Sequence, residues 1–252
     1  ANGGKGPKKV WKDAKGGEFQ VELVLIDNPV NMGDTFAAGD VHIGWATVDM
    51  LPLVVQRLNR DLRTMPRVYQ QIDWSNGGDG IVVRESIKSV ADLRGKKVVL
   101  AQNSPSHFFL LNALLNGGVQ PDEVEMVFTK DAFQAARAYA TQKDLAGCVS
   151  WAPDIYRIAE KLPGNRLLVT TLEANHLIAD VWFARADFAR DNPDIIEGLV
   201  RGILDATTEL KDDTKKQQAA KWMSDGYGIP ADETLGMLGD AHWTNYAENR
   251  EF

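Results

Sequence analysis

Short apolar runs alternate with helix-like segments along most of the chain. Runs rich in branched and aromatic residues, which favour strands, recur at FQVELVLI (19–26), VHIGWAT (41–47), KKVVLA (96–101), EVEMVF (123–128) and LAGCVS (145–150). The segments between them place apolar residues at helical spacing, as in 105–116 and 131–142. Strands that alternate with helices predict an α/β fold built from parallel βαβ units.

The last quarter of the chain departs from this alternation. After a predicted strand at 177–185, apolar residues recur with a helical period, and the pattern predicts three helices, at 192–212, 214–225 and 231–249. At the other end, the Gly- and Lys-rich stretch before Glu18 shows no periodicity and is typical of a loop.

A weak internal repeat indicates two similar lobes. TFAAGDVHIGWATVDMLPLV and AYATQKDLAGCVSWAPDIYRI share the order helix end, Asp, short strand, Trp-bearing loop and helix. We expect residues 1–77 with 182–252 to form lobe one and residues 78–181 to form lobe two, with hinge crossings near 73–82 and 177–184. Because open α/β sheets bind ligands beyond their strand ends, a cleft between the lobes is the expected site.

Composition narrows the class of ligand. The 252 residues carry a net charge of -7, and no basic run interrupts the sequence, which disfavours nucleic acid and anionic membranes as partners. No apolar stretch reaches the ~20 residues of a membrane span, so we expect a chain that does not itself span the membrane. The single cysteine, Cys148, excludes an internal disulfide and a multi-cysteine zinc site; its strand context predicts a packing role.

The stretch LAQNSPSHFFLLNALLNGG (100–118) passes from a strand through a polar loop into a helix. A helix N-terminus has unpaired N–H groups and partial positive charge, so it can hold an anion. Ser104, Ser106 and His107 are therefore candidate ligand contacts. The alternative is that Ser104 only caps the helix and Pro105 is its first residue.

Three further candidates lie at strand ends. Thr47 and Asp49 follow the strand 41–47, although Asp49 is equally suited to cap the next helix. Trp151 ends the strand 145–150 and either covers a ligand face or packs in the core.

Two more sets lie on the crossings. Asp180, between apolar residues, either binds a cationic or hydroxyl part of the ligand or pairs inside the protein. Trp74, Ser75 and Asn76 offer ligand contacts at the first crossing, or form a turn before the glycines that follow.

Motifs for catalysis are absent from the sequence. It contains no GxSxG, HExxH, paired-cysteine or P-loop pattern. We therefore expect no catalytic residues, no metal site and no cofactor.

Five segments occur together in an order that resembles a known family: AAGDVHIGWATVDMLPLV, DWSNGGDGIVV, SIKSVADLRGKKVVLAQNSPSHFFLLNALL, VSWAPDIY and LIADVWFARADFARDNPDII. They are similar to the substrate-binding proteins of nitrate, sulfonate and taurine ABC importers, a family that includes binders of thiamin-precursor pyrimidines. The resemblance covers roughly residues 19–225. It implies the periplasmic-binding fold of type II, with two α/β lobes, and places Ser104, Ser106 and His107 in the ligand loop.

The resemblance also implies a function. It is that of an exported, periplasmic or cell-envelope protein that closes on a small anionic or zwitterionic solute of the sulfonate, nitrate or phosphonate class. The implied partner is an ABC permease in the inner membrane, and the implied state is a monomer. The chain carries no signal peptide, and no segment before Phe19 has the pattern of the family's first strand of lobe one. That strand is expected to be missing, or Val10 and Trp11 supply a poor substitute for it.

Two alternatives stay open. One is a ligand-sensing domain of a larger envelope protein. The other is a thiamin-pyrimidine binder or synthase; in the family, the synthase depends on a cysteine-rich segment and iron, whereas this chain has one cysteine and four scattered histidines.

Overall fold

The computed structural model describes residues 10–26, 29–174 and 176–252. The chain divides into two compact units: unit 1 is Ala1–Asp73, Asp180–Leu238 and Trp243–Phe252, and unit 2 is Trp74–Ala179 and Gly239–His242. The lobes expected from the sequence have boundaries at 77/78 and 181/182, and they keep all of 182–252 in lobe one. In the structure, by contrast, the short segment 239–242 belongs to unit 2. Closure of the two units about a hinge stays a prediction.

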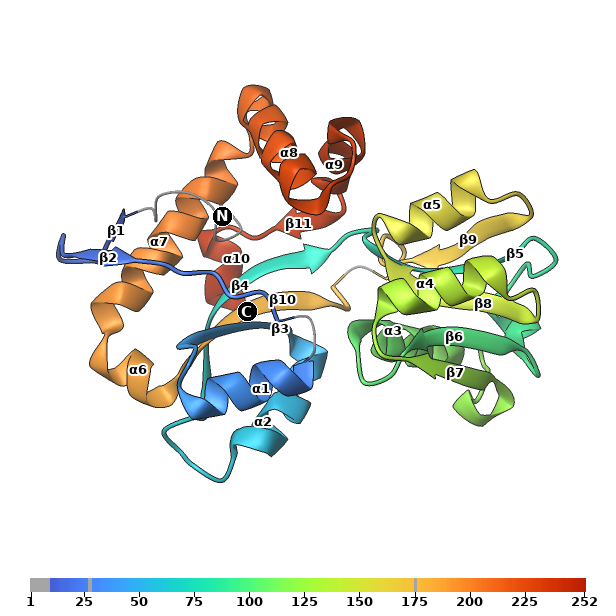
Figure 1. Cartoon of the computed structure of the whole chain (residues 1–252), viewed down its shortest axis with the longest axis horizontal. Coiled ribbons are helices and arrows are strands. Elements are labelled where there is room, and N and C mark those ends of the chain that lie inside the picture. The colour runs from blue at the N-terminus through green and yellow to red at the C-terminus, as the bar shows by residue number, and fades with distance from the viewer. Residues whose placement is uncertain (1–9, 27–28, 175) are drawn as a thin grey trace. The chain divides into compact units, whose positions relative to one another are not determined.

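Most of unit 1 is built on a four-stranded sheet with the strand order β11-β4-β10-β3; residues 74–75, 179 and 241–242 of this sheet are assigned to unit 2. These strands are β3 (Ile43–Thr47), β4 (Pro66–Ser75), β10 (Ala179–Arg185) and β11 (Ala241–Trp243). The helix α1 (Pro29–Ala38) packs against β3 and against α2 (Leu51–Leu58), and the short 3-10 helix η1 (Val48–Met50) joins β3 to α2 (Figure 1). Between them lies one buried cluster: Phe36, Ala46, Met50, Val54, Leu58 and Phe183.

The remaining elements of unit 1 lie outside that sheet. Strands β1 (Val10–Lys12) and β2 (Glu18–Gln20) pair with each other in antiparallel fashion, forming a separate two-stranded sheet that packs against α7. The helices are α6 (Ala186–Asp191), α7 (Pro193–Glu209), α8 (Asp213–Tyr227), α9 (Ala231–Met237) and α10 (Tyr246–Glu251).

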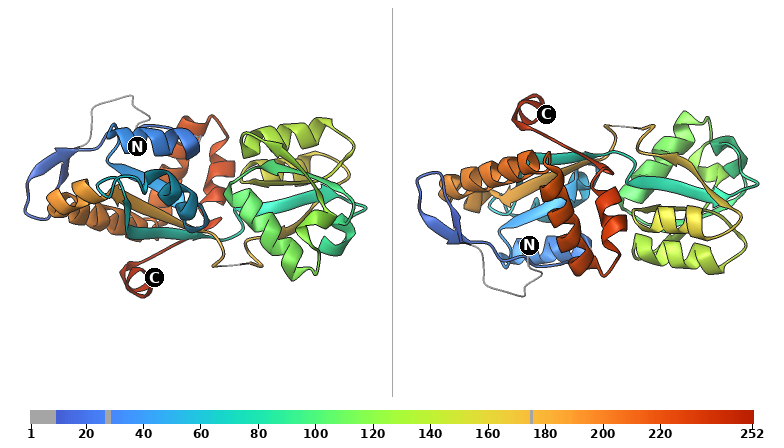
Figure 2. Two further views of the ribbon diagram at one scale, coloured as in Figure 1. Left: turned by 90° about the horizontal axis from the view of Figure 1, so that it is seen from below. Right: turned by 90° about the horizontal axis from the view of Figure 1, so that it is seen from above.

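Unit 2 has three layers. Its five-stranded sheet has the order β7-β6-β8-β5-β9, with α3 (Pro105–Asn116) on one face and α4 (Ala132–Thr141) and α5 (Asp154–Lys161) on the other (Figure 2). The strands are β5 (Asp79–Arg84), β6 (Lys97–Ala101), β7 (Glu125–Thr129), β8 (Leu145–Trp151) and β9 (Asn165–Thr170), and two 3-10 helices, η2 (Val90–Leu93) and η3 (Pro121–Glu123), complete the unit. Alternate side chains of the central strands point into the apolar clusters on opposite faces of the sheet. Both faces are buried, so the sequences of these strands are continuously apolar.

The sequence predictions fail at four places. The stretch before Glu18, expected to be a loop, contains the strand β1 (Val10–Lys12). The run 19–26 is a strand only at its beginning; residues 21–26 have no regular structure, and Leu25 is 87% exposed, because no described strand pairs with them. The predicted helix 231–249 is broken by β11, since pairing with β4 and the bonds from Thr244 to the carbonyls of Gln71 and Ile72 outweigh local propensity. The sheet of unit 2 is mixed rather than parallel: β5 runs antiparallel to β8 and β9.

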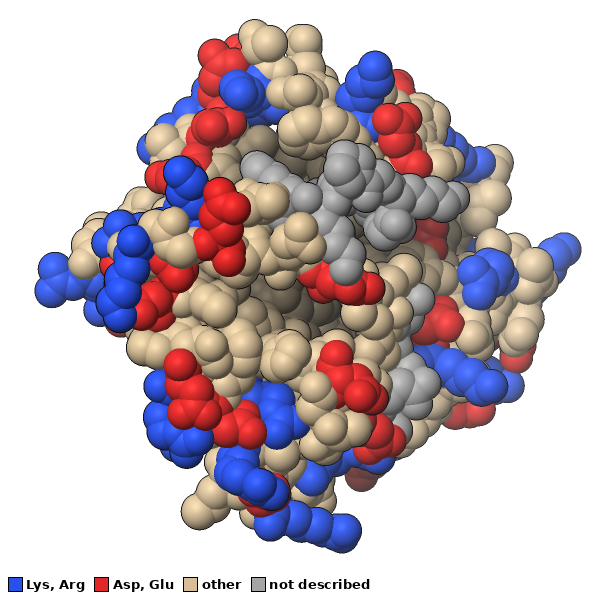
Figure 3. Space-filling view, turned by 60° about the vertical axis from the view of Figure 1, so that its left-hand side comes forward, with Lys and Arg blue, Asp and Glu red and all other residues tan. Residues whose placement is uncertain are grey.

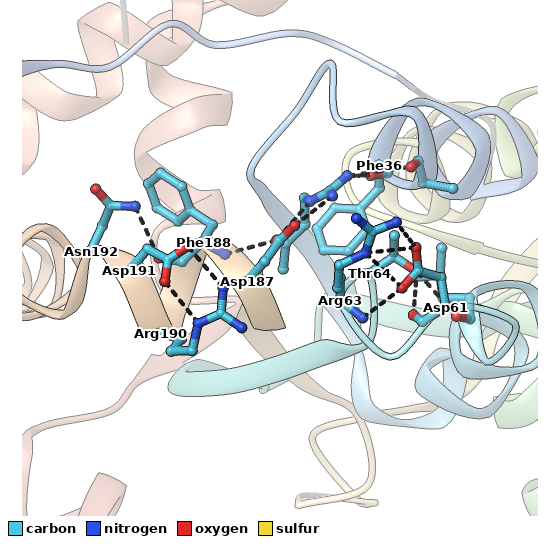
Figure 4. A network of polar contacts seen from close by, with 12 residues as sticks. Phe36, Asp61, Arg63, Thr64, Asp187, Phe188, Arg190, Asp191 and Asn192 are labelled. Atoms are coloured by element: carbon cyan, nitrogen blue, oxygen red, sulfur yellow. Dashed lines mark hydrogen bonds and ion pairs between the residues drawn. The ribbon is translucent and has the colours of Figure 1, made fainter.

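The Arg185 side chain ties the end of β10 to α1 and α6 of unit 1; its partners Phe36 and Asp187 are labelled in Figure 4. Its Nη1 donates to the carbonyl oxygens of Phe36 (2.8 Å) and Ala37 (3.3 Å) at the end of α1. Its Nε and Nη2 donate to the Asp187 carboxylate at 3.0 and 2.8 Å. This bidentate pair holds the pKa of Asp187 down to about 2.

The surface is charged but mixed. On the face drawn in Figure 3, lysine and arginine side chains alternate with aspartate and glutamate, without a broad field of one sign. Within the described residues, none of the helices has both the length and the apolar character needed to cross a membrane.

Gly44 offers a direct test of how the unit 1 core is packed. A Cβ at this position would lie 2.4 Å from the ring of Phe183, which is fully buried. We expect Gly44→Ala to lower the free energy of unfolding by about 1–3 kcal/mol, measured by urea denaturation, because the ring has no room to move. Gly226→Ala in α8 is the matched control: no atom lies near its Cβ, so helix propensity should raise stability by up to about 1 kcal/mol. Equal effects of the two substitutions would contradict this packing.

The Asp187 pair predicts a defined acid dependence. A carboxylate whose folded pKa is depressed contributes stability above its unfolded pKa of ~3.9 and loses it as the pH falls through the folded value. We expect Asp187→Asn to cost about 1 kcal/mol at pH 7, allowing for partial exposure of the pair. The difference from the unchanged protein should shrink between about pH 4 and pH 2. A difference that stays constant across this range would contradict the ion pair.

Candidate functional site

One edge of the unit 2 sheet gathers several strand ends. Strands β6, β7 and β8 are parallel, so their carboxyl ends meet there. Because β5 is antiparallel to β8 and β9, it begins at the same edge: Asp79 lies opposite Trp151, and Gly80 opposite Thr170. The candidates from this unit lie on or next to this edge: Trp74, Ser75, Asn76, Ser104, Ser106, His107 and Trp151. Open α/β sheets place ligands at such an edge.

Ser104 caps α3. Its Oγ accepts a hydrogen bond from the His107 N–H (3.4 Å) and donates to the carbonyl oxygen of Ala101 (2.8 Å). Pro105 is the first helical residue, so the predicted N-cap at Ser104 is confirmed, and ligand contact by Ser104 stays a prediction. This cap is uncharged, and the first turn of α3 contains no acidic residue.

The two other helices that begin at this edge are different: Asp131 caps α4, and Asp154 lies in the first turn of α5. Of these three, α3 alone keeps its N-terminal positive potential free of a nearby carboxylate.

Ser106 stands in the first turn of α3 with its side chain fully buried. Its hydroxyl has no hydrogen-bond partner among the described residues. A buried hydroxyl without a partner costs roughly 1–3 kcal/mol, so such a group calls for a physical explanation. An anion oxygen at the start of α3 would accept a hydrogen bond from the Ser106 hydroxyl and remove this energetic cost.

His107 contributes a hydrogen-bonding group rather than a charge. Its Nδ1 accepts from the Asn103 N–H (3.3 Å), and its ring packs edge-on against Phe128 at 5.2 Å between centroids. Burial lowers the pKa of the imidazole, which favours the neutral form at pH 7. With Nδ1 as the acceptor, the proton resides on Nε2, which remains a donor.

Ser75 and Asn76 are largely committed to contacts inside unit 2. The Ser75 hydroxyl donates to Asp79 Oδ2 (2.6 Å) and lies 2.8 Å from Thr171 Oγ1. The Asn76 side chain donates to the Gly239 carbonyl (3.2 Å), and its backbone N–H donates to the Asp240 carbonyl (2.7 Å). These bonds favour the loop-stabilising alternative, and ligand contact by either residue stays a prediction.

Aromatic side chains flank the same edge. Trp151 is half-buried, with its ring at right angles to that of Phe133 and 5.7 Å from it. Trp74 lies against the His176 ring at 4.8 Å between centroids. Neither tryptophan is fully buried in the core, so each keeps surface that a ligand could contact.

Sequence reasoning missed a polar network beside these residues. Thr171 holds the backbone of this loop: its Oγ1 accepts hydrogen bonds from the N–H groups of Gly77 (2.9 Å) and Asp79 (3.3 Å). The Tyr156 hydroxyl donates to Asp240 Oδ1 (2.8 Å), and burial raises the pKa of Asp240. Asp79 was visible inside the GGDG motif, but no signal links Tyr156 with Asp240, because 84 residues separate them.

The unit 1 candidates converge at the end of β3. Asp180 on β10 lies directly opposite Thr47, and Asp49 follows two residues later in η1. The prediction that Asp49 caps the next helix is wrong: Met50 occupies the N-cap of α2, and no side chain caps it. Burial raises the pKa of Asp49, and the Thr47 hydroxyl and the residue's own N–H offset this only in part.

Other kinds of site find little support in the described part of the chain. No group of three His, Cys, Asp or Glu side chains there has the arrangement of a metal site. The Cys148 thiol lies fully buried in β8, and burial raises its pKa, so the thiolate form is strongly disfavoured.

A family model described as "NMT1/THI5 like" matches residues 15–216, which is most of the chain. The chain belongs to the NMT1/THI5-like family. This match includes β3, β10 and the α3 loop, and therefore every candidate residue described above.

Two curated relatives of this NMT1/THI5-like chain are bacterial binding proteins. The taurine-binding periplasmic protein of Escherichia coli is 26% identical over 197 residues, which are 77% of this chain and 58% of the relative. A putative aliphatic sulfonates-binding protein of Escherichia coli is 27% identical over 217 residues, which are 85% of this chain and 64% of the relative. The chain thus spans less than two thirds of the length of these relatives.

Solved structures share the fold. The periplasmic aliphatic sulphonate binding protein SsuA of Escherichia coli has a TM-score of 0.75 at 22% identity, with 90% of this chain and 75% of that chain covered. The periplasmic nitrate-binding protein NrtA of Synechocystis has a TM-score of 0.67 at 14% identity, with 87% and 62% covered. The α/β fold of periplasmic binding proteins, expected from the sequence, is confirmed.

Ser106→Ala separates folding from ligand binding. The buried hydroxyl makes no bond within the described chain, so we expect its removal to leave the free energy of unfolding unchanged or slightly higher. If the bound anion accepts a hydrogen bond from this hydroxyl, the affinity of the Ser106→Ala variant for ethanesulfonate should be about tenfold lower, measured by isothermal titration calorimetry.

Ser104→Ala is the comparison variant for Ser106→Ala. It removes an observed helix cap and should cost about 1 kcal/mol of stability. A large stability loss in Ser106→Ala with unchanged affinity would show that Ser106 is a structural residue only.

Proposed function

We propose that this chain is the solute-binding part of an extracytoplasmic protein that serves an ABC importer. It binds a small anionic or zwitterionic solute of the sulfonate, nitrate or phosphonate class. The loaded protein delivers the solute to a permease in the inner membrane. The protein acts in the periplasm or cell envelope as a monomer.

One observation carries the choice of an anion. The N-terminus of α3 combines an uncharged cap, a first turn without acidic residues and the buried, unpaired hydroxyl of Ser106. These features give partial positive charge and a hydrogen-bond donor at one place, which is what an anion's oxygens require. The names of the relatives support the same chemistry, since they describe binders of taurine, aliphatic sulfonates and nitrate.

Fold alone does not separate a binding protein from an enzyme. The desulfurization enzyme DSZB also shares the fold, with a TM-score of 0.56 at 16% identity. The chemistry of this chain favours binding: its one thiol, at Cys148, is fully buried in the middle of a strand with a raised pKa, so it cannot serve as an exposed nucleophile. A binding protein needs shaped polar contacts and no nucleophile.

The proposal predicts saturable stabilisation of the chain by one anion class. In a thermal unfolding series with ethanesulfonate, nitrate, phosphate and methylphosphonate, we expect one class to raise the Tm by a few degrees. A ligand at 100 times its Kd adds about 2.7 kcal/mol to stability. Sodium chloride at matched ionic strength is the control for screening effects. If no member of the panel shifts the Tm of the folded chain, a small-anion binding function is contradicted, and the ligand-sensing alternative gains.

A further inference from the structure

The edge of the unit 2 sheet that leads into α3 also carries exposed aromatic side chains. Phe128, near the end of β7, is 43% exposed, and Phe133, in the first turn of α4, is 40% exposed. Among the described residues of unit 2, no other phenylalanine, tyrosine or tryptophan is exposed to this degree. Single exposed apolar residues need no explanation, but several at one edge are typical of a binding surface.

The position of β7 explains why Phe128 stays open. Phe128 is in register with Leu100 of β6, so the two side chains lie on the same face of the sheet. Leu100 is fully buried in the core beneath α3, whereas β7 is an edge strand that α3 covers only in part. The Phe128 ring meets the ring of His107, from the first turn of α3, at an angle of 68°.

Phe133 belongs to a second pair of rings at the same edge. The helix α4 buries Ala135 and Ala136 in the core, and Phe133 lies outside that cluster. Its ring stands at 84° to the ring of Trp151, which ends β8. In such a pair one ring turns an edge toward one face of the other, so each ring keeps at least one face free of its partner.

The strand that leads into α3 lies between the strands that carry these pairs. In the sheet, β6 has β7 on one side and β8 on the other. The Thr129 hydroxyl lies within hydrogen-bonding distance of the carbonyl oxygens of Leu100 (3.2 Å) and Asp131 (2.8 Å), which ties the turn between β7 and α4 to the end of β6. An anion bound at the buried Ser106 hydroxyl would therefore have aromatic side chains beside it.

We propose that Phe128 and Phe133 determine specificity, and that the solute is an anion whose organic group is an aromatic ring, such as an arylsulfonate. This inference rests on the proposed function, because the start of α3 must hold the sulfonate. The positive edge of an aryl ring suits the negative faces of phenylalanine and tryptophan. A small inorganic anion would leave these side chains in water, without the gain that comes from burying apolar surface.

The test compares three sulfonates of equal charge. Isothermal titration calorimetry of the whole chain at pH 7 would measure the Kd of benzenesulfonate, cyclohexanesulfonate and ethanesulfonate. We expect benzenesulfonate to bind at least about tenfold more tightly than ethanesulfonate, because it buries more apolar surface. It should also bind at least about threefold more tightly than cyclohexanesulfonate, which has as many carbon atoms but no aromatic ring.

Substituting both phenylalanines isolates the contribution of their rings. Phe128→Leu combined with Phe133→Leu keeps two apolar side chains and removes both rings, so the preference for benzenesulfonate over cyclohexanesulfonate should disappear. Leu115→Ala is the matched control. It truncates an exposed apolar side chain in the last turn of α3, about 15 Å along the helix from its start, and should retain the full preference.

The outcomes distinguish the two proposals. Benzenesulfonate binding no more tightly than ethanesulfonate or than cyclohexanesulfonate would overturn the aromatic specificity and leave the sulfonate-binding function standing. A preference that survives the double substitution would do the same. The absence of binding for all three ligands would overturn the proposed function and this inference together. Urea unfolding of each variant verifies folding, and the ratios in the unchanged protein test the proposal even if a variant is unstable.

Discussion

Each unit contains a strand that runs antiparallel to the strand carrying candidate side chains, and main-chain hydrogen bonds hold the two in register. In unit 1, β10 pairs with β3 and brings Asp180 opposite Thr47. In unit 2, β5 pairs with β8 and brings Asp79 opposite Trp151. A slip of one residue in either pair would move every side chain of the strand to the other face. The apolar cores prevent that slip, because Phe183 and Val82 must stay buried.

Chemically, the two units offer different surfaces. The edge of unit 2 presents the N-terminus of α3, with positive potential and a buried donor on Ser106. The surface of unit 1 presents carboxylates and tryptophans and has acceptor character. Ser106 in unit 2 and Asp49 in unit 1 each carry a buried polar group that has no hydrogen-bond partner among the described residues, which costs stability in the free protein. Such a cost is expected where binding geometry is prepared before the ligand arrives.

Much of the fold follows from local patterns. The strand-to-helix transition at 100–118 was predictable because Ser104, Pro105 and the paired glycines mark the helix ends. The failures have tertiary causes. Residues 21–26 have strand propensity, but no described strand pairs with them, and 241–243 leaves the helical pattern because β4 offers hydrogen bonds.

The candidate site was predictable only in part. Strand ends and helix starts reveal Thr47, Ser104 and Trp151 from the sequence alone. The roles of Asp49 and Ser75 depend on contacts that no local pattern encodes: Asp49 caps no helix, and Ser75 donates to Asp79. Residues that meet across long sequence separations, such as Tyr156 and Asp240, become visible only in three dimensions.

The proposed function depends on the N-terminus of α3 holding the anionic group of the solute. A crystal structure of the chain grown with 2-aminoethanesulfonate would show where that group binds. We expect sulfonate oxygens within ~2.7–3.2 Å of the Ser106 hydroxyl and the Ser106 N–H. A sulfonate bound elsewhere, with the Ser106 hydroxyl still unpaired, would contradict it.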